Sequence, residues 1–174
     1  MAAGETVVVF TIHATRKLLD RVKQPVEDPV SPPTSLFGNW YATVLFWKPQ
    51  IALFVNEATL LPVLVALAPA ATLGRRFPDQ LRVVLDAHAI APKIIDHEIG
   101  AMGQARYAKT ANRSVVGIMN EFAYLGDLHR HDPRVADLEA VALEISRTPC
   151  GPLDKRHGSP DRELHALLNG PTPG

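Results

Sequence analysis

The side chains best suited to recognise a ligand are gathered in residues 109–121, which read KTANRSVVGIMNE. The polar members of this segment and its glycine are Lys109, Thr110, Asn112, Arg113, Ser114, Gly117, Asn120 and Glu121. If Asn112 or Ser114 caps a helix here, the backbone N–H groups of the next turn point outward at the positive end of the helix dipole. That end can hold a phosphate or a carboxylate, and Lys109 and Arg113 would add positive charge.

The predicted site is therefore an anion-capable helix N-terminus at residues 112–117, but a structural interpretation competes with it. In that interpretation the polar residues only cap the helix, and Arg113 pairs with Glu121 or Glu98. Gly117 would then serve tight helix packing rather than the close approach of a ligand. The sequence leaves both interpretations open, because helix caps are common.

Asn56 is the remaining candidate for a binding residue. Together with Glu57 it closes a predicted strand, and polar side chains often meet a ligand at the end of a sheet. The alternative is an Asx turn, in which the Asn side chain hydrogen-bonds to the backbone just after it. We favour this alternative.

The sequence predicts no metal site and no cofactor, and it assigns no catalytic residue. His129 and His131 stand two apart, yet they lie at a predicted helix end, where the helix dipole favours histidine. Cys150 lies in a loop rich in Pro and Gly and is better explained as a packing cysteine than as a nucleophile. The His97–Glu98 pair lacks the second histidine of a zinc protease motif.

The composition is that of a folded protein, with 174 residues of which 47% are hydrophobic. Eighteen Lys and Arg balance eighteen Asp and Glu, so no overall charge attracts nucleic acid, which we do not favour as a partner. The uncharged residues 58–74 are fewer than a membrane-spanning helix needs, and prolines interrupt them. We therefore expect a soluble, cytoplasmic protein that does not bind membranes.

Hydrophobic periodicity predicts a single α+β domain over residues 1–147. Strands are expected at residues 6–12, 40–47, 51–55 and 60–67, and helices at residues 14–22, 72–88, 92–102, 115–128 and 135–145. The last strand is placed at a sheet edge because it contains Pro62. These elements predict a small antiparallel sheet from the N-terminal half, packed on one face by helices from the C-terminal half. Residues 148–174 are expected to form a Pro/Gly-rich tail with a short helix at residues 162–168 and a disordered end.

Several segments resemble one family of small bacterial proteins. They are Trp40-Tyr41-Ala42, Phe54-Val55-Asn56-Glu57, residues 109–121, and Thr15-Arg16-Lys17-Leu18-Leu19 in the first predicted helix. On these segments the chain resembles the domain-of-unknown-function family six-nine-three-three, most specifically at Asn112-Arg113-Ser114 and Met119-Asn120. The likeness covers about residues 7–128. It supports the choice of site and implies a bacterial origin, and because the family has no assigned activity it implies no chemistry.

Two functions follow from these observations. The first is a non-catalytic binding or interaction module that presents the predicted helix start to an unknown protein or a small anionic ligand. The second is a small hydrolase or nuclease-like enzyme that uses Lys109, Arg113 and Glu121 on a phosphate-bearing substrate, although the segment contains no histidine to act as general base. We favour the binding module. The sequence leaves catalysis open, and also a homo-oligomer formed through an exposed strand edge.

Overall fold

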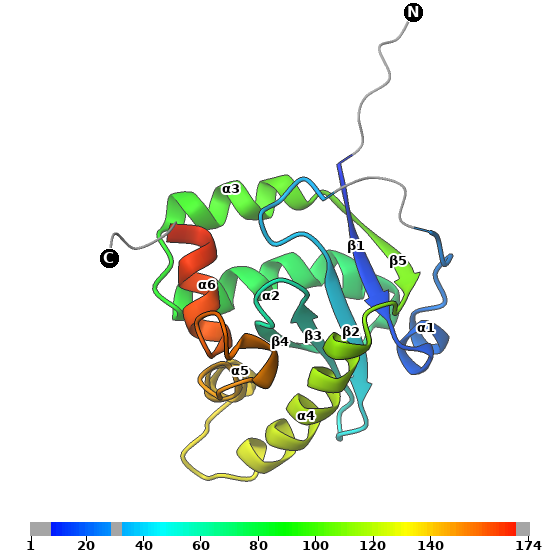
Figure 1. Cartoon of the computed structure of the whole chain (residues 1–174). Coiled ribbons are helices and arrows are strands. Elements are labelled where there is room, and N and C mark those ends of the chain that lie inside the picture. Colours follow the sequence, from blue (N-terminus) through cyan, green and yellow to red (C-terminus); the bar gives the residue numbers. More distant parts are fainter. Residues whose placement is uncertain (1–7, 29–32, 170–174) are drawn as a thin grey trace, which may run out of the picture.

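Within residues 8–28 and 33–169, which the computed structural model describes, five strands form one mixed sheet in the order β4–β3–β2–β1–β5 (Figure 1). The strands are β1 (Val9–Ala14), β2 (Trp40–Leu45), β3 (Ile51–Asn56), β4 (Pro62–Ala66) and β5 (Gln104–Lys109). The α+β class is confirmed, and β4 lies at the sheet edge as Pro62 predicted. The first two positions of the predicted first strand and the predicted disordered end at residues 170–174 lie outside the described residues.

The prediction of an antiparallel sheet is wrong for its N-terminal strand. β2–β3 and β3–β4 are antiparallel pairs, but β1 runs parallel to both β2 and β5. Helix α1 (Arg16–Val22) and the loop after it carry the chain from the end of β1 back to the start of β2, which a parallel pair requires. β5, which the hydrophobic pattern did not predict, pairs with all of β1, from Val9 opposite Gln104 to Ala14 opposite Lys109.

Helices cover both faces of the sheet, whereas the sequence predicted one covered face. The remaining α-helices are α2 (Leu73–Ala87), α3 (Pro92–Met102), α4 (Arg113–Arg130), α5 (Leu138–Ser146) and α6 (Pro160–Asn169). In Figure 1, α4 crosses in front of β2 and α2 lies behind the sheet. Trp40 and Phe54 pack toward α2, while Tyr41 and Leu53 pack toward α4 and α5. Because every residue of β3 is buried and side chains alternate along a strand, both faces are apolar and both need a cover.

The described part of the predicted tail packs on the core. Leu164 and Leu168 of α6 join the apolar cluster behind the sheet, and Cys150 joins the cluster in front. The short helix expected at residues 162–168 is present as α6. The division of the chain at residue 147 stays a prediction.

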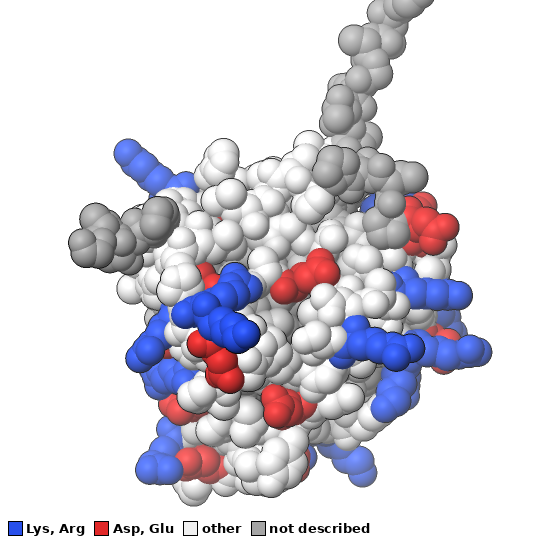
Figure 2. Space-filling model, viewed as in Figure 1, with Lys and Arg blue, Asp and Glu red and all other residues white. Residues whose placement is uncertain are grey.

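The surface mixes charges of both signs over much of the face in Figure 2. On the right of that view, Lys and Arg side chains gather beside α1 and the end of β5. Among the described residues, no helix combines the length and the apolar character needed to cross a membrane. The cytoplasmic location stays a prediction.

Candidate functional site

The predicted site lies where the chain leaves the sheet after β5. This strand ends at Lys109, and α4 begins at Arg113 after a three-residue turn that contains the half-buried Thr110. Asn112 caps the helix, because its Oδ1 accepts hydrogen bonds from the backbone N–H groups of Ser114 (3.0 Å) and Val115 (3.3 Å). Of the two caps that the sequence left open, Asn112 and Ser114, the structure has the cap at Asn112. It also occupies two of the backbone donors that would otherwise be open to an external anion.

Two buried aromatic side chains of the sheet hold this turn in place. The backbone N–H of Asn112 donates to Tyr41 Oη at 3.0 Å. His13 stacks on Tyr41 with ring centroids 4.8 Å apart, and its Nδ1 donates to the carbonyl of Lys109 at 2.9 Å. Burial is the main cause that raises the pKa of Tyr41, and the nearby Glu57 carboxylate also raises it, so the phenol stays neutral. The turn is therefore fixed to β1 and β2.

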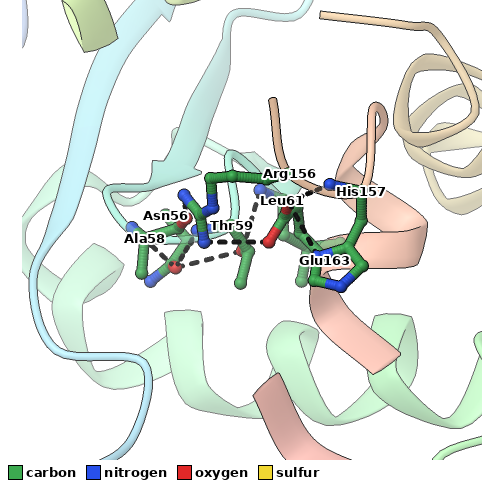
Figure 3. Close-up of polar contacts among 7 residues, drawn as sticks. All are labelled: Asn56, Ala58, Thr59, Leu61, Arg156, His157 and Glu163. Carbon is green, nitrogen blue, oxygen red and sulfur yellow. Dashed lines mark hydrogen bonds and ion pairs between the residues drawn. The ribbon is translucent and has the colours of Figure 1, made fainter. Parts of the chain in front are cut away.

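The loop between β3 and β4, residues 57–61, borders the helix start. Asn112 Nδ2 lies 3.5 Å from Glu57 Oε1, which places a carboxylate of the chain itself beside the helix N-terminus. Asn56 is fully buried and forms the Asx turn that we favoured: its Oδ1 accepts from the backbone N–H of Ala58 (3.1 Å) and of Thr59 (2.9 Å). Asn56 therefore shapes the loop (Figure 3).

The other candidates lie on the outward face of α4. Exposed there are Arg113, Ser114, Gly117, Asn120 and Glu121. A Cβ atom at Gly117 would meet nothing within 4 Å, so the glycine is not required for packing against the described residues. Within those residues Arg113 forms no ion pair with Glu121, and Glu98 is buried and accepts from the backbone N–H of Leu36 instead. The predicted structural roles of Gly117 and Arg113 are thus not seen.

Two surface features adjoin the helix start. The first, which we call the basic rim, comprises Arg16, Lys17, Lys109 and Arg113, all exposed. The rim spans the ends of the parallel strands β1 and β5, because Ala14 pairs with Lys109 in register. The second, which we call the α4 stripe, comprises Gly117, Glu121, Tyr124 and Leu128 at spacings of three and four residues, so they share one side of the helix. Tyr124 is 67% exposed and Leu128 is 54% exposed, so the stripe presents two large side chains with apolar surface one turn apart.

A second polar group, which sequence analysis missed, lies beyond the β3–β4 loop. We call it the Glu163 cluster; it comprises Arg156, His157 and Glu163 (Figure 3). Glu163 is only 2% exposed, and its carboxylate pairs with Arg156 Nη2 at 2.8 Å and with His157 Nδ1 at 3.1 Å. Arg156 also donates to the carbonyl of Ala58 at 3.0 Å. No spacing signal marks Glu163, because a buried acid in a short amphipathic helix resembles a solvated one in sequence.

The cysteine, histidine and tryptophan side chains that the sequence also offered contact the fold itself. Burial is the main cause that raises the pKa of the Cys150 thiol to about 11, which agrees with a packing cysteine. His131 Nδ1 contacts the carbonyl of Asp127 at the end of α4. Among the described residues, no three His, Cys, Asp or Glu side chains are arranged to hold a metal ion. Trp47 is partly buried against Gly126, with the guanidinium of Arg130 4.7 Å from its ring centroid.

The sequence itself places the chain in a family. Residues 11–163 match the family described as Domain of unknown function (DUF6933). The chain belongs to this family. The match includes the basic rim, the α4 stripe and the Glu163 cluster, so all three lie inside the DUF6933 region. No curated protein and no solved structure matches the chain.

Proposed function

We propose that this DUF6933 protein is a binding module that docks an acidic protein surface on the basic rim and the α4 stripe. The observation that carries the proposal is that the positive charges of the basic rim are not balanced by acidic side chains of the described residues. Among the described residues, none of the four rim side chains has an acidic partner. Other exposed cations of these residues, such as Lys93, also lack one, so the rim is distinguished by its position at the ends of β1 and β5, beside the α4 stripe. Because Ala14 pairs with Lys109, the start of α1 and the end of β5 lie side by side, and an acidic partner would supply opposite charge to both.

The α4 stripe extends this surface beyond a simple charge contact. Tyr124 lies eleven residues after Arg113, which is about 16 Å along an α-helix. A single small anion would reach only the rim, and an exposed contact of that kind contributes little because water and salt screen it. A protein surface with acidic groups at one end and an apolar patch at the other would cover both features. Exposed tyrosine is typical of the residues that dominate protein interfaces.

The backbone part of the predicted anion site is less suited to an external ligand. Asn112 already accepts from two first-turn N–H groups, and the Glu57 carboxylate would repel a second anion at the helix axis. The proposed contacts are therefore made by side chains. The fixed turn supports this role, because the backbone that carries Lys109 and Arg113 is already ordered and loses little conformational freedom on binding.

The hydrolase or nuclease-like alternative gains less support from the geometry. His13 reaches the turn, but it is buried and its Nδ1 is bonded to the carbonyl of Lys109. Glu121 is exposed on the outer side of α4, where no hydrogen bond to the described residues orients it. A general base must lie within hydrogen-bond reach of the proton that it removes. We therefore rank the binding module first.

The experiment compares partner capture by matched variants, followed by mapping of the contact surface. Immobilised wild-type protein, Arg113→Glu, Tyr124→Ala and the control Arg134→Glu are exposed to a cell extract. Arg134 is exposed and pairs with Asp132, away from the rim. Any protein retained is purified, and backbone hydrogen exchange of α4 is measured with and without it.

The proposal expects a retained protein that is lost from both test variants, kept by the control, and protective of α4 against exchange. A partner that binds all four proteins equally, or that protects other elements instead, would overturn it. If the retained species is a second copy of the chain, the surface serves self-association and the proposed acidic partner is wrong. Capture of nucleic acid or of a small molecule alone would also contradict the proposal.

A further inference from the structure

A small pocket opens where the apolar core in front of the sheet reaches the surface. It lies between the turn of the β2–β3 hairpin and the segment that joins α4 to α5, near the lower end of the view in Figure 1. Its volume is about 290 Å³, close to the lower limit for small-molecule sites. The residues that line it include Trp47, Lys48, Ile51, Arg130, Leu138 and Val141.

The apolar lining residues converge because they belong to one face of the sheet and to the helix that covers it. Leu45 and Ile51 pair in register at the end of the hairpin, and Trp47 follows Leu45 by two residues. Alternation therefore places all three on the face that α4 and α5 cover, where they pack in one cluster with Leu138 and Val141. Ile51 and Val141 are buried, whereas Trp47 and Leu138 are partly exposed. The pocket thus has an apolar wall on both sides.

Arg130 supplies the polar part of the lining, and two contacts fix its guanidinium. Its Nε donates to Asp127 Oδ1 at 2.7 Å, and its guanidinium carbon lies 4.7 Å from the ring centroid of Trp47. The Arg130 side chain is 33% exposed. Its terminal groups Nη1 and Nη2 form no hydrogen bond with the described residues. They form a planar fork of donors, whose geometry matches the two oxygens of a carboxylate.

The charges around the pocket leave one cation unbalanced. Asp127 balances Arg130, and the acidic side chain in the lining is Asp137, whose Oδ1 accepts from the backbone N–H of Ala140 at 2.8 Å and caps α5. Lys48 is exposed and has no acidic partner within residues 8–28 and 33–169. An anion at the Arg130 fork would therefore also meet the positive charge of Lys48.

We propose that this pocket binds a small aromatic carboxylate. The carboxylate accepts hydrogen bonds from Nη1 and Nη2 of Arg130, and Lys48 adds positive charge beside it. The aromatic body packs between Trp47 and Leu138, since aromatic rings pack favourably on an indole. The inference is independent of the proposed partner of α4, because no lining residue belongs to the basic rim or to the α4 stripe.

The test is a titration followed by nuclear magnetic resonance of ¹⁵N-labelled protein. The chain has two tryptophans and hence two indole N–H signals. Trp47 lines the pocket, while Trp40 is fully buried behind the sheet and serves as an internal reference. The probes are benzoate, its uncharged analogue benzamide, and acetate, which has the carboxylate without the ring. A Trp47→Phe variant identifies the signals.

The variants are Arg130→Met, Lys48→Gln and the matched control Arg147→Met. Arg147 also pairs with an acid three residues before it, as Arg130 does, but lies outside the pocket lining. Thermal unfolding of each variant verifies that it is folded. The comparison of benzoate with benzamide uses the wild-type protein alone, so it does not depend on any variant.

The expected result is that benzoate shifts the indole signal of Trp47 and leaves that of Trp40 in place. Benzamide and acetate are each expected to bind roughly tenfold more weakly, and Arg130→Met to weaken benzoate binding by a similar factor. Lys48→Gln should weaken it by less, and Arg147→Met should leave it unchanged. Equal binding of benzoate and benzamide would overturn the proposal, as would the absence of a shift at Trp47. Equal weakening by Arg147→Met would also overturn it, since that outcome reports only general charge.

Discussion

The start of α4 and the Glu163 cluster both border the β3–β4 loop, yet they differ in whether their arginine side chains have acidic partners. In the Glu163 cluster, Arg156 contacts a buried carboxylate and the carbonyl of Ala58, so its charge is used within the fold. At the start of α4, Arg113 and Lys109 have no acidic partner among the described residues. The comparison separates a charge that serves the fold, on Arg156, from charges that no acidic side chain of the described residues balances, on Lys109 and Arg113.

The largest effect is expected at the Glu163 cluster. Glu163→Ala removes the acceptor of Arg156, of the His157 ring and of the His157 backbone N–H. We expect the free energy of unfolding to fall by about 2 kcal/mol, less than for a fully buried pair because both partners regain water. Urea denaturation measures the loss. The control is Asp154→Ala, an exposed acid in the same segment; an equal loss there would mean that burial of Glu163 contributes nothing special.

Acid should also lower the stability of the fold, through His88 at the end of α2. Burial is the main cause that lowers the pKa of His88 to about 4, and Asp161 of α6 partly opposes the shift. Between pH 6.5 and 4 the unfolded chain binds a proton that the folded chain does not, so the free energy of unfolding falls as the pH falls. The expected slope is about 1 kcal/mol per pH unit. Denaturation at several pH values measures it. A His88→Gln variant should lose that part of the slope, and an unchanged slope would contradict the assignment to His88.

A smaller effect is expected at the cap of α4. Asn112→Ala leaves the backbone N–H groups of Ser114 and Val115 without their acceptor. We expect a loss of about 1 kcal/mol in the free energy of unfolding, the usual cost of removing an Asn cap. Ser114→Ala is the matched control because Ser114 is exposed and its side chain caps nothing. If both substitutions cost the same, Asn112 does not act as the cap in solution.

The smallest effect on stability is expected at Arg113 itself. This side chain is exposed and unpaired among the described residues, so Arg113→Ala should change the free energy of unfolding by less than about 0.5 kcal/mol. Chemical denaturation checks that value. The substitution should nevertheless weaken capture of an acidic partner. A large loss of stability would instead show that Arg113 serves the fold, and the contrast with Arg156 would disappear.

The sequence predicted those elements whose physical signals are local. The spacing of Leu73, Phe77 and Leu81 predicted α2, and the polar residues before an apolar run predicted a cap at Asn112 or Ser114, of which the structure has the first. β5 lacked such a signal. Only Tyr107 and Ala108 are buried in it, and its exposed polar residues hide the strand pattern.

The contacts between distant segments could not be predicted from the sequence in the same way. Parallel pairing depends on where α1 returns the chain, which periodicity does not record. The burial of Glu163 depends on Arg156 and His157 arriving from a different turn of the chain. The site prediction at residues 112–117 named a helix start whose cap is present, but whether the side chains were paired required the fold around them. The rim has no sequence signature of its own, because its four cations come from two segments that only the fold brings together.

The position of β1 has a consequence for how the chain folds. The hairpins β2–β3 and β3–β4 join neighbours in sequence and can form early, whereas β1 must wait for β5, whose residues stand 95 positions later (Val9 opposite Gln104). Contacts of such high contact order form slowly, because a long loop must close first. A nascent chain that has not yet released residue 109 from the ribosome therefore carries β1 with one edge unpaired. During synthesis this strand, rather than any edge of the finished sheet, is the segment most open to mispairing with another chain.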